Sequence, residues 1–321
     1  MVTVFVHREG RTAQADRVDP AWLDPRGGAV VWVDLAAPTP DEARLLEEVF
    51  HFHELAVEDA LAEIHHPKVE SYDGYLYVIL HGIDFQAAQH RFATRDVDFF
   101  LGPTYLVTVS DGRSRSVARV RELAARNGWV LAEGPAALMH RIVDAMVDNY
   151  RPEVERLEAR IDRVEREVVE RPRAELMRSV LALKRDVASL RHVTSPQRDV
   201  VARLARREFP VIGEQVAYRL RDVYDHLVRL ADEGLMMQDR IAGLLETHLA
   251  STSNQLNAVT KVLAVIATAL ILPTVLAGLW GMNVELPTFP GGPAAQFWWV
   301  VGLIAASVGG MLAVFRAKRW F

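Results

Sequence analysis

Two uncharged stretches decide the class of this protein: residues 262–280, VLAVIATALILPTVLAGLW, and residues 297–315, FWWVVGLIAASVGGMLAVF. Each is long enough to cross a hydrocarbon core of about 30 Å as a helix. Helices of this length in a soluble protein nearly always keep a polar face, which these stretches lack. Pro273 is compatible with a membrane helix, because neighbouring groups can satisfy the carbonyl that it frees. The sequence therefore predicts two transmembrane helices.

Charges beside the two stretches predict their orientation. Lys261 precedes the first, Arg316 and Lys318 follow the second, and the connector at 281–296 has no lysine or arginine. The positive-inside rule places both ends of the membrane part in the cytosol and the connector outside. No cleaved signal peptide is expected, since the first residues lack a basic segment and an apolar core. Four tryptophans lie where interfacial anchors are expected: Trp280, Trp298, Trp299 and Trp320.

Composition narrows the class of function. Of 321 residues, 50% are hydrophobic and 25% are charged, which suits a soluble domain joined to a small membrane part. The net charge of -5 argues against a nucleic-acid partner. The absence of cysteine excludes disulfides and thiolate chemistry. No phosphate loop or nucleophile–base spacing is visible, so we do not expect an enzyme.

The first part of the chain, residues 1–130, predicts a cytosolic α/β domain. Thr39 and Pro40 have the residue types of a helix N-cap and first turn, followed by two acids. Further helices are expected over 55–64 and 114–127. Runs rich in β-branched and aromatic residues predict strands at 29–35, 75–81, 97–101 and 105–110.

Long helices dense in charge follow. Residues 131–212 predict a helical hairpin region, with a helix over 151–170, a break at Arg171-Pro172 and a second helix over 173–207. A third helix is expected over 213–280, about 100 Å long if it continues unbroken into the first span. Such helices usually form a solvated bundle, but this continuity favours a mechanical lever. The rest divides into the connector at 281–296, the second span at 297–315 and a basic cytosolic tail at 316–321.

Small or polar residues recur along one stripe of the first span at spacings of three and four. They are Asn257, Thr260, Ala264, Ala267, Ile271, Thr274 and Gly278. By itself this pattern favours a close helix–helix contact in lipid. A pore is the alternative, and it needs several copies of the chain around an axis, because two helices cannot enclose an aqueous path.

Several histidines and acids invite a metal-site reading. The spacing of His51, His53 and the pair His65 and His66 does not match the i, i+4 pairs of zinc enzymes, so exposed or capping histidines are expected. Taken alone, Glu58 and Asp59 are explained as first-turn acids of a helix, favoured by its dipole.

The tripeptide Gly281-Met282-Asn283 stands immediately after the first span. In this position it resembles the signature of the CorA family of magnesium channels. Further segments resemble the family in the same order along most of the chain: LAVEDAL at 55–61, PKVESYDGYLYVIL at 67–80, RDVYDH at 221–226 and KVLAVIAT at 261–268.

The resemblance implies a funnel-shaped homopentamer in the lipid bilayer that takes up hydrated magnesium, and cobalt, across the plasma membrane. The first span would line the pore. Asn283 and the Gly281 carbonyl would accept hydrogen bonds from the hydrated ion, which binds weakly enough to leave. Leu263 and Ile271 would form an apolar constriction that gates by dewetting. Met282, Thr274 and Asn257 complete the expected pore residues.

A regulatory magnesium site in the cytosol is also implied. Its expected ligands are Asp59, Asp222, Glu58 and His226, with Asp59 and Asp222 facing one another across neighbouring subunits. Two close carboxylates repel, so a divalent ion between them would hold the ring closed. Two alternatives stay open: zinc transport of the ZntB type, and a membrane-anchored coiled-coil scaffold.

Overall fold

The computed structural model describes residues 1–62, 66–86, 91–170, 174–282 and 289–318. Its contacts group the chain into two compact units, Met1–Leu244 and Leu245–Phe321. Helix α8, Glu214–Trp280, belongs to both. The strands of the first unit are β1 (Val2–Arg8), β2 (Arg11–Ala15), β3 (Val30–Ala36), β4 (Lys68–Tyr72), β5 (Tyr75–Gln86), β6 (Arg91–Leu101) and β7 (Tyr105–Ser110). Its helices before α8 are α1 (Pro40–Glu48), α2 (Glu54–Leu61), α3 (Arg115–Arg126), α4 (Trp129–Ala132), α5 (Pro135–Asp148), α6 (Tyr150–Glu170) and α7 (Ala174–Ala205), with short 3-10 turns at Pro20–Leu23 and Pro25–Gly27.

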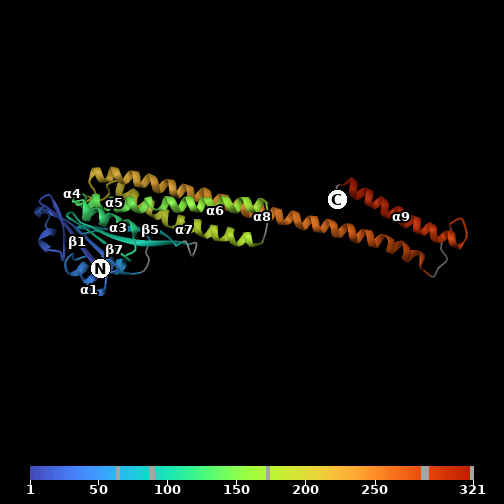
Figure 1. Cartoon of the computed structure of the whole chain (residues 1–321), viewed down its shortest axis with the longest axis horizontal. Coiled ribbons are helices and arrows are strands. Elements are labelled where there is room, and N and C mark those ends of the chain that lie inside the picture. Colours follow the sequence, from blue (N-terminus) through green and yellow to red (C-terminus); the bar gives the residue numbers. More distant parts are fainter. Residues whose placement is uncertain (63–65, 87–90, 171–173, 283–288, 319–321) are drawn as a thin grey trace. The chain divides into compact units, whose positions relative to one another are not determined.

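The described strands form one sheet in the order β2-β1-β3-β7-β6-β5-β4. Its pairs are antiparallel except for β3 and β7, which run parallel. One face packs against α1 and α2 through Val31, Val33, Leu46 and Ala56, all almost fully buried. Helix α5 contacts strands β3, β5, β6 and β7, and α7 contacts β4, β5 and β6 (Figure 1). The expected α/β domain is therefore present.

Local sequence explains where α1 begins. Thr39 Oγ1 accepts a hydrogen bond from the Glu42 N–H at 3.3 Å, and Glu42 Oε2 accepts one from the Thr39 N–H at 2.9 Å. Pro40 fills the first turn, where its missing N–H costs nothing. The predicted helix start at this position is confirmed.

Helices α6, α7 and the first part of α8 pack through apolar stripes. In α6 the buried stripe consists of Leu157, Ile161, Val164 and Val168. In α8 the buried positions of the first unit include Leu220, Val223, Leu227, Leu230, Met237, Ile241 and Leu244. Ion pairs join the helices outside these stripes, with Arg160 2.7 Å from Asp186 and Arg240 2.6 Å from Asp162. This arrangement holds the first part of α8 against the other helices of its unit.

The second unit contains the end of α8 and helix α9, Pro293–Ala317, which turns back in the opposite direction (Figure 1). Among the described residues, α8 and α9 are the two helices long and apolar enough to cross a membrane, with mean hydropathy of 2.5 and 2.0 in their most apolar windows. Neither window is buried inside the chain. The combination of length, hydropathy and exposure agrees with the two predicted spans.

Candidate functional site

One face of the membrane part of α8 is left uncovered within the chain. Partial burial follows a helical stripe at Val265, Ala269, Leu272 and Leu276, and Ala264 and Pro273 are half-buried beside it. The expected pore residues Leu263 and Ile271 are 60% and 61% exposed, and Thr274 is exposed as well. At 3.6 residues per turn, these three lie on the side of the helix away from the half-buried stripe. Asn257 is also exposed, earlier on the same helix.

Near the C-terminal end of α8, the uncovered face carries few polar groups. Thr274 Oγ1 donates to the Leu270 carbonyl at 2.7 Å, which leaves its oxygen lone pairs able to accept from a ligand. Pro273 lies inside the helix and cannot donate to the carbonyl four residues earlier. Gly278 has open space where a side chain would begin. This face of α8 is therefore mainly apolar, with hydroxyl and carbonyl oxygens near the C-terminal end of the helix.

The signature tripeptide begins as α8 ends. The Gly281 N–H donates to the Ala277 carbonyl at 2.9 Å, continuing the helical pattern by one residue. Met282 is 53% exposed. Asn283, the residue expected to contact the ion, lies outside the described residues, as do Glu285 and Trp320. Its role therefore stays a prediction.

Helix α2 positions Glu58 and Asp59, and their explanation as first-turn acids is wrong. Glu54 is the acid of the first turn, whereas Glu58 and Asp59 lie close to the C-terminal end at Leu61. Negative charge near a helix C-terminus is unfavourable, because the exposed carbonyls carry partial negative charge. His53 caps the N-terminus by accepting from the Leu55 N–H at 3.2 Å, as expected of a capping histidine. The helix dipole thus gives no reason for the two acids.

A cation already accompanies Asp59. Lys68 Nζ lies 2.5 Å from Asp59 Oδ2 and 3.1 Å from Glu70 Oε1. Burial by itself lowers the pKa of Lys68, but the hydrogen bonds to Asp59 and Glu70 outweigh it and raise that pKa. Glu58, in contrast, is exposed. Asp59 therefore sits in a site that favours positive charge.

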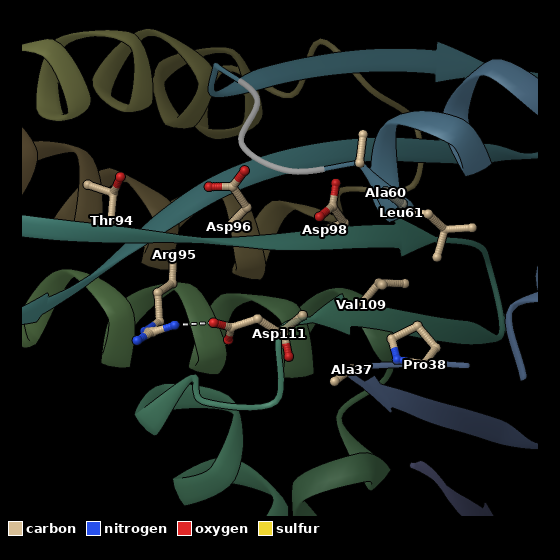
Figure 2. Close-up of a pocket in the computed structure, with 12 residues that line it drawn as sticks. Ala37, Pro38, Ala60, Leu61, Thr94, Arg95, Asp96, Asp98, Val109 and Asp111 are labelled. Atoms are coloured by element: carbon tan, nitrogen blue, oxygen red, sulfur yellow. Dashed lines mark hydrogen bonds and ion pairs between the residues drawn. The ribbon is translucent and has the colours of Figure 1, made fainter. Parts of the chain in front are cut away.

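Behind the end of α2 lies an acid-lined cavity of about 490 Å³. Figure 2 shows Thr94, Asp96 and Asp98 on one side of β6, while Arg95 points from the other side of the strand. Tyr77 donates to Asp98 Oδ1 at 2.6 Å. Burial, together with the charges of Asp96 and Asp59, raises the pKa of Asp98 to about 7.

The remaining expected ligands, Asp222 and His226, lie one turn apart on α8. Asp222 Oδ2 is 3.9 Å from His226 Nε2, and the Asp222 side chain is 73% exposed. Asp144 on α5 interacts electrostatically with both of these residues. Burial raises the pKa of Asp144, and the negative charges of Asp148 and Asp222 raise it further. His226 opposes this rise and lowers the pKa. The sequence analysis missed Asp144 and Asp148. Their i, i+4 spacing was the available signal, but it points to a site only once α5 is known to face α8.

A single chain does not complete a metal site from these residues. Among the described residues, no group of three or more His, Asp or Glu side chains is arranged to hold a metal ion. Asp59 and Asp222 lie on different elements, α2 and α8. The expected pairing between neighbouring subunits stays a prediction.

Comparisons with known proteins agree along almost the whole chain. The family model for the CorA-like Mg2+ transporter protein matches residues 27–319. The Thermotoga maritima cobalt/magnesium transport protein CorA is 30% identical over 322 residues, which cover 98% of this chain and 89% of that protein. The Bacillus subtilis protein YfjQ, whose name describes a metal ion transporter, is 32% identical over 96% of this chain and 92% of its own length.

Solved structures share the fold. The complete CorA magnesium transporter from Methanocaldococcus jannaschii superposes with a TM-score of 0.85 at 18% identity, covering 100% of this chain and 99% of that one. The ZntB cytoplasmic domain from Vibrio parahaemolyticus gives a TM-score of 0.63 at 15% identity and covers 78% of this chain and 98% of that domain. At such identities these matches establish the fold alone. From the family match, the chain belongs to the CorA-like Mg2+ transporter family.

Proposed function

We propose that this chain is a divalent-cation channel whose principal ion is hydrated magnesium, built as a homopentamer in the plasma membrane with both termini in the cytosol. The observation that carries the proposal is the uncovered face of α8, with Leu263, Ile271 and Thr274 exposed and the signature tripeptide following directly. Family membership and the names of the relatives support transport of magnesium and cobalt.

A ring of copies follows from the physics of the two spans. One chain offers two membrane helices, which cannot surround an aqueous path. Copies arranged around an axis would turn the exposed face of α8 toward a shared path, with the polar oxygens of Thr274 and Gly281 along it. Magnesium sheds its water shell reluctantly, so neutral oxygen donors that contact the hydrated ion release it more readily than a carboxylate cage.

Cytosolic control is assigned to Asp59 and Glu58 of one subunit with Asp222 and His226 of the next, supported by Asp144 and Asp148. Within one chain, Lys68 lies beside Asp59, and His226 lies 3.9 Å from Asp222. A magnesium ion between subunits would neutralise the repulsion and favour the closed ring. Only the closed state provides the complete site, which is what ligand-controlled closure requires.

Flux into liposomes tests the proposal. Purified chain should load vesicles with magnesium, and Asn283→Ala should reduce that flux to the level of empty vesicles while keeping the pentameric mass in detergent. Zinc and cobalt are offered in competition, so preferred zinc uptake would favour the alternative ion. A chain that is only monomeric or dimeric, or that conducts no ion, would contradict the channel and leave the scaffold.

A further inference from the structure

The described ends of the connector between α8 and α9 are joined by a set of contacts that the proposed function does not use. Phe289 lies between two tryptophans: its ring centroid is 6.0 Å from that of Trp280 and 5.5 Å from that of Trp299. The interplanar angles are 11° and 22°, so all three rings are stacked. Trp280 is the last residue of α8, and Trp299 lies on α9, so the stack links the two spans.

The side chain of Gln296 holds the middle residue of the stack, Phe289, through hydrogen bonds to the Phe289 backbone. Its Oε1 accepts from the Phe289 N–H at 3.1 Å, and its Nε2 donates to the Phe289 carbonyl at 2.5 Å. The side chain thereby satisfies both backbone groups of a residue outside any helix or strand. Gln296 and Trp299 are three apart on α9, so they share one face of it.

The turn between Phe289 and α9 is built for this contact. Gly291 has φ +119°, and a Cβ added there would lie 2.6 Å from the Ala295 Cβ, so only glycine fits without a shift. The Gly292 carbonyl accepts the first helical hydrogen bond, from the Ala295 N–H at 2.8 Å. Pro293 then starts α9 at a position where its missing N–H is not needed. The chain is turned back so that the Gln296 amide reaches Phe289.

We propose that Gln296, acting with the stacked rings of Trp280, Phe289 and Trp299, holds the two ends of the connector and so sets how tightly the outer end of the pathway binds its ion. These residues are positioning residues, since they act through the backbone beside Gly281 and need not touch the ion. This inference rests on the proposed function. It assigns the large aromatics beside the connector a task beyond membrane anchoring.

The physical reason is preorganisation. An ion is bound well only while the Gly281 end of α8 is held in the competent position, and the apparent dissociation constant rises as the fraction in that position falls. Removing the Gln296 amide loses two hydrogen bonds to Phe289. A loss of this size should raise the half-saturating magnesium concentration roughly three- to tenfold. Maximal flux at saturating magnesium should stay close to that of the wild type, because excess ion restores the occupied state.

Magnesium flux into liposomes is measured over a range of external concentrations, giving half-saturation and maximal flux separately. Gln296→Ala should show the rise in half-saturation. Gln296→Glu keeps an acceptor for the Phe289 N–H but loses the donor, so an intermediate value is expected. A variant that merely folds or inserts poorly lowers maximal flux and leaves half-saturation unchanged, and that pattern would contradict the inference.

Trp298 provides the matched control. It neighbours Trp299, is 69% exposed and makes an edge contact with Phe297 instead of joining the stack. Trp299→Leu should raise half-saturation and Trp298→Leu should not. Phe289→Ala, which removes the ring, should raise half-saturation. Phe289→Tyr, which keeps the ring, should have the half-saturation of the wild type.

The double variant Gln296→Ala with Trp299→Leu tests whether the two side chains act as a unit. A shift no larger than that of the more affected single variant supports one positioning element, because coupled residues are not additive. Unchanged half-saturation in both single variants, or equal shifts in Trp298→Leu and Trp299→Leu, would overturn the inference. Absence of flux in the wild-type chain would instead overturn the proposed function.

Discussion

At the scale of single residues, the carboxyl group of Asp98 has a protonation state that depends on pH in the cytosolic range. Burial raises its pKa to about 7, and the hydrogen bond from Tyr77 opposes that rise. In the unfolded chain an aspartate has a pKa of about 3.9. At a pH between these two pKa values, Asp98 is protonated in the folded chain and ionised in the unfolded chain. Stability from this group is therefore present at low pH and is lost as pH rises through about 7.

Asp98→Asn should remove that pH dependence. Asparagine keeps an oxygen that accepts from Tyr77 and carries no charge to bury. The thermal midpoint of the variant should exceed that of wild type increasingly from about pH 5 to about pH 8. Thermal unfolding in detergent measures this, with Asp225→Asn as an exposed control for the loss of one negative charge. A constant difference between variant and wild type across that range would show that Asp98 does not titrate there.

The sequence identified part of the candidate site at this scale and left out the rest for a definite reason. Asp222 and His226 were named because the segment RDVYDH at 221–226 resembles the CorA family, not because of a local pattern. Asp144 and Asp148 join them through the packing of α5 against α8, and no local pattern encodes that contact. The ion pair between Asp59 and Lys68 likewise needs α2 to lie against β4. Sites that combine distant segments become visible only with the fold.

At the scale of elements, two of the three strands that the sequence missed are the edges of the sheet. The inner strands β3 and β7 are apolar runs and were predicted. Strands β2 and β4 are the two edges, each paired on one side only, and their sequences RTAQA and KVESY are mixed in polarity. Edge strands often carry charged residues, which discourage pairing with other chains. Strand β1, considered only as a candidate leader, is a third omission.

Helix α8 supports a prediction about its uncovered face. Ile271→Asn puts an amide into the proposed apolar constriction, which should hold water and conduct when the channel is closed. Magnesium leak at high internal magnesium should rise several-fold. Leu272→Asn is the matched control, since Leu272 is adjacent but belongs to the half-buried stripe. Equal leak from both variants would mean that the constriction lies elsewhere.

At the scale of the whole molecule, α8 joins the acids of the first unit to the apolar segment of the second by continuous backbone. Asp222 and Ile271 belong to one helix of 67 residues. Replacing Asp222 with Asn removes one carboxylate from each proposed intersubunit site. Half-closure should then need about tenfold more internal magnesium, while open flux is kept. Flux measured against internal magnesium checks this, with Asp225→Asn as the control on the same helix. Unchanged closure in both Asp222→Asn and Asp59→Asn would assign control to other residues.

The order of the elements has a further consequence for how the protein is made. Every described strand of the sheet lies between Val2 and Ser110, whereas the apolar parts of α8 and α9 come much later. Domains generally fold as units during synthesis, N-terminal parts first, at about 5–20 residues per second. The sheet can therefore close on the ribosome before either hydrophobic helix has been translated. A folded domain then precedes the spans. In the proposed orientation, a folded domain that stays on the cytosolic side leaves the short connector at 281–296 to cross the bilayer.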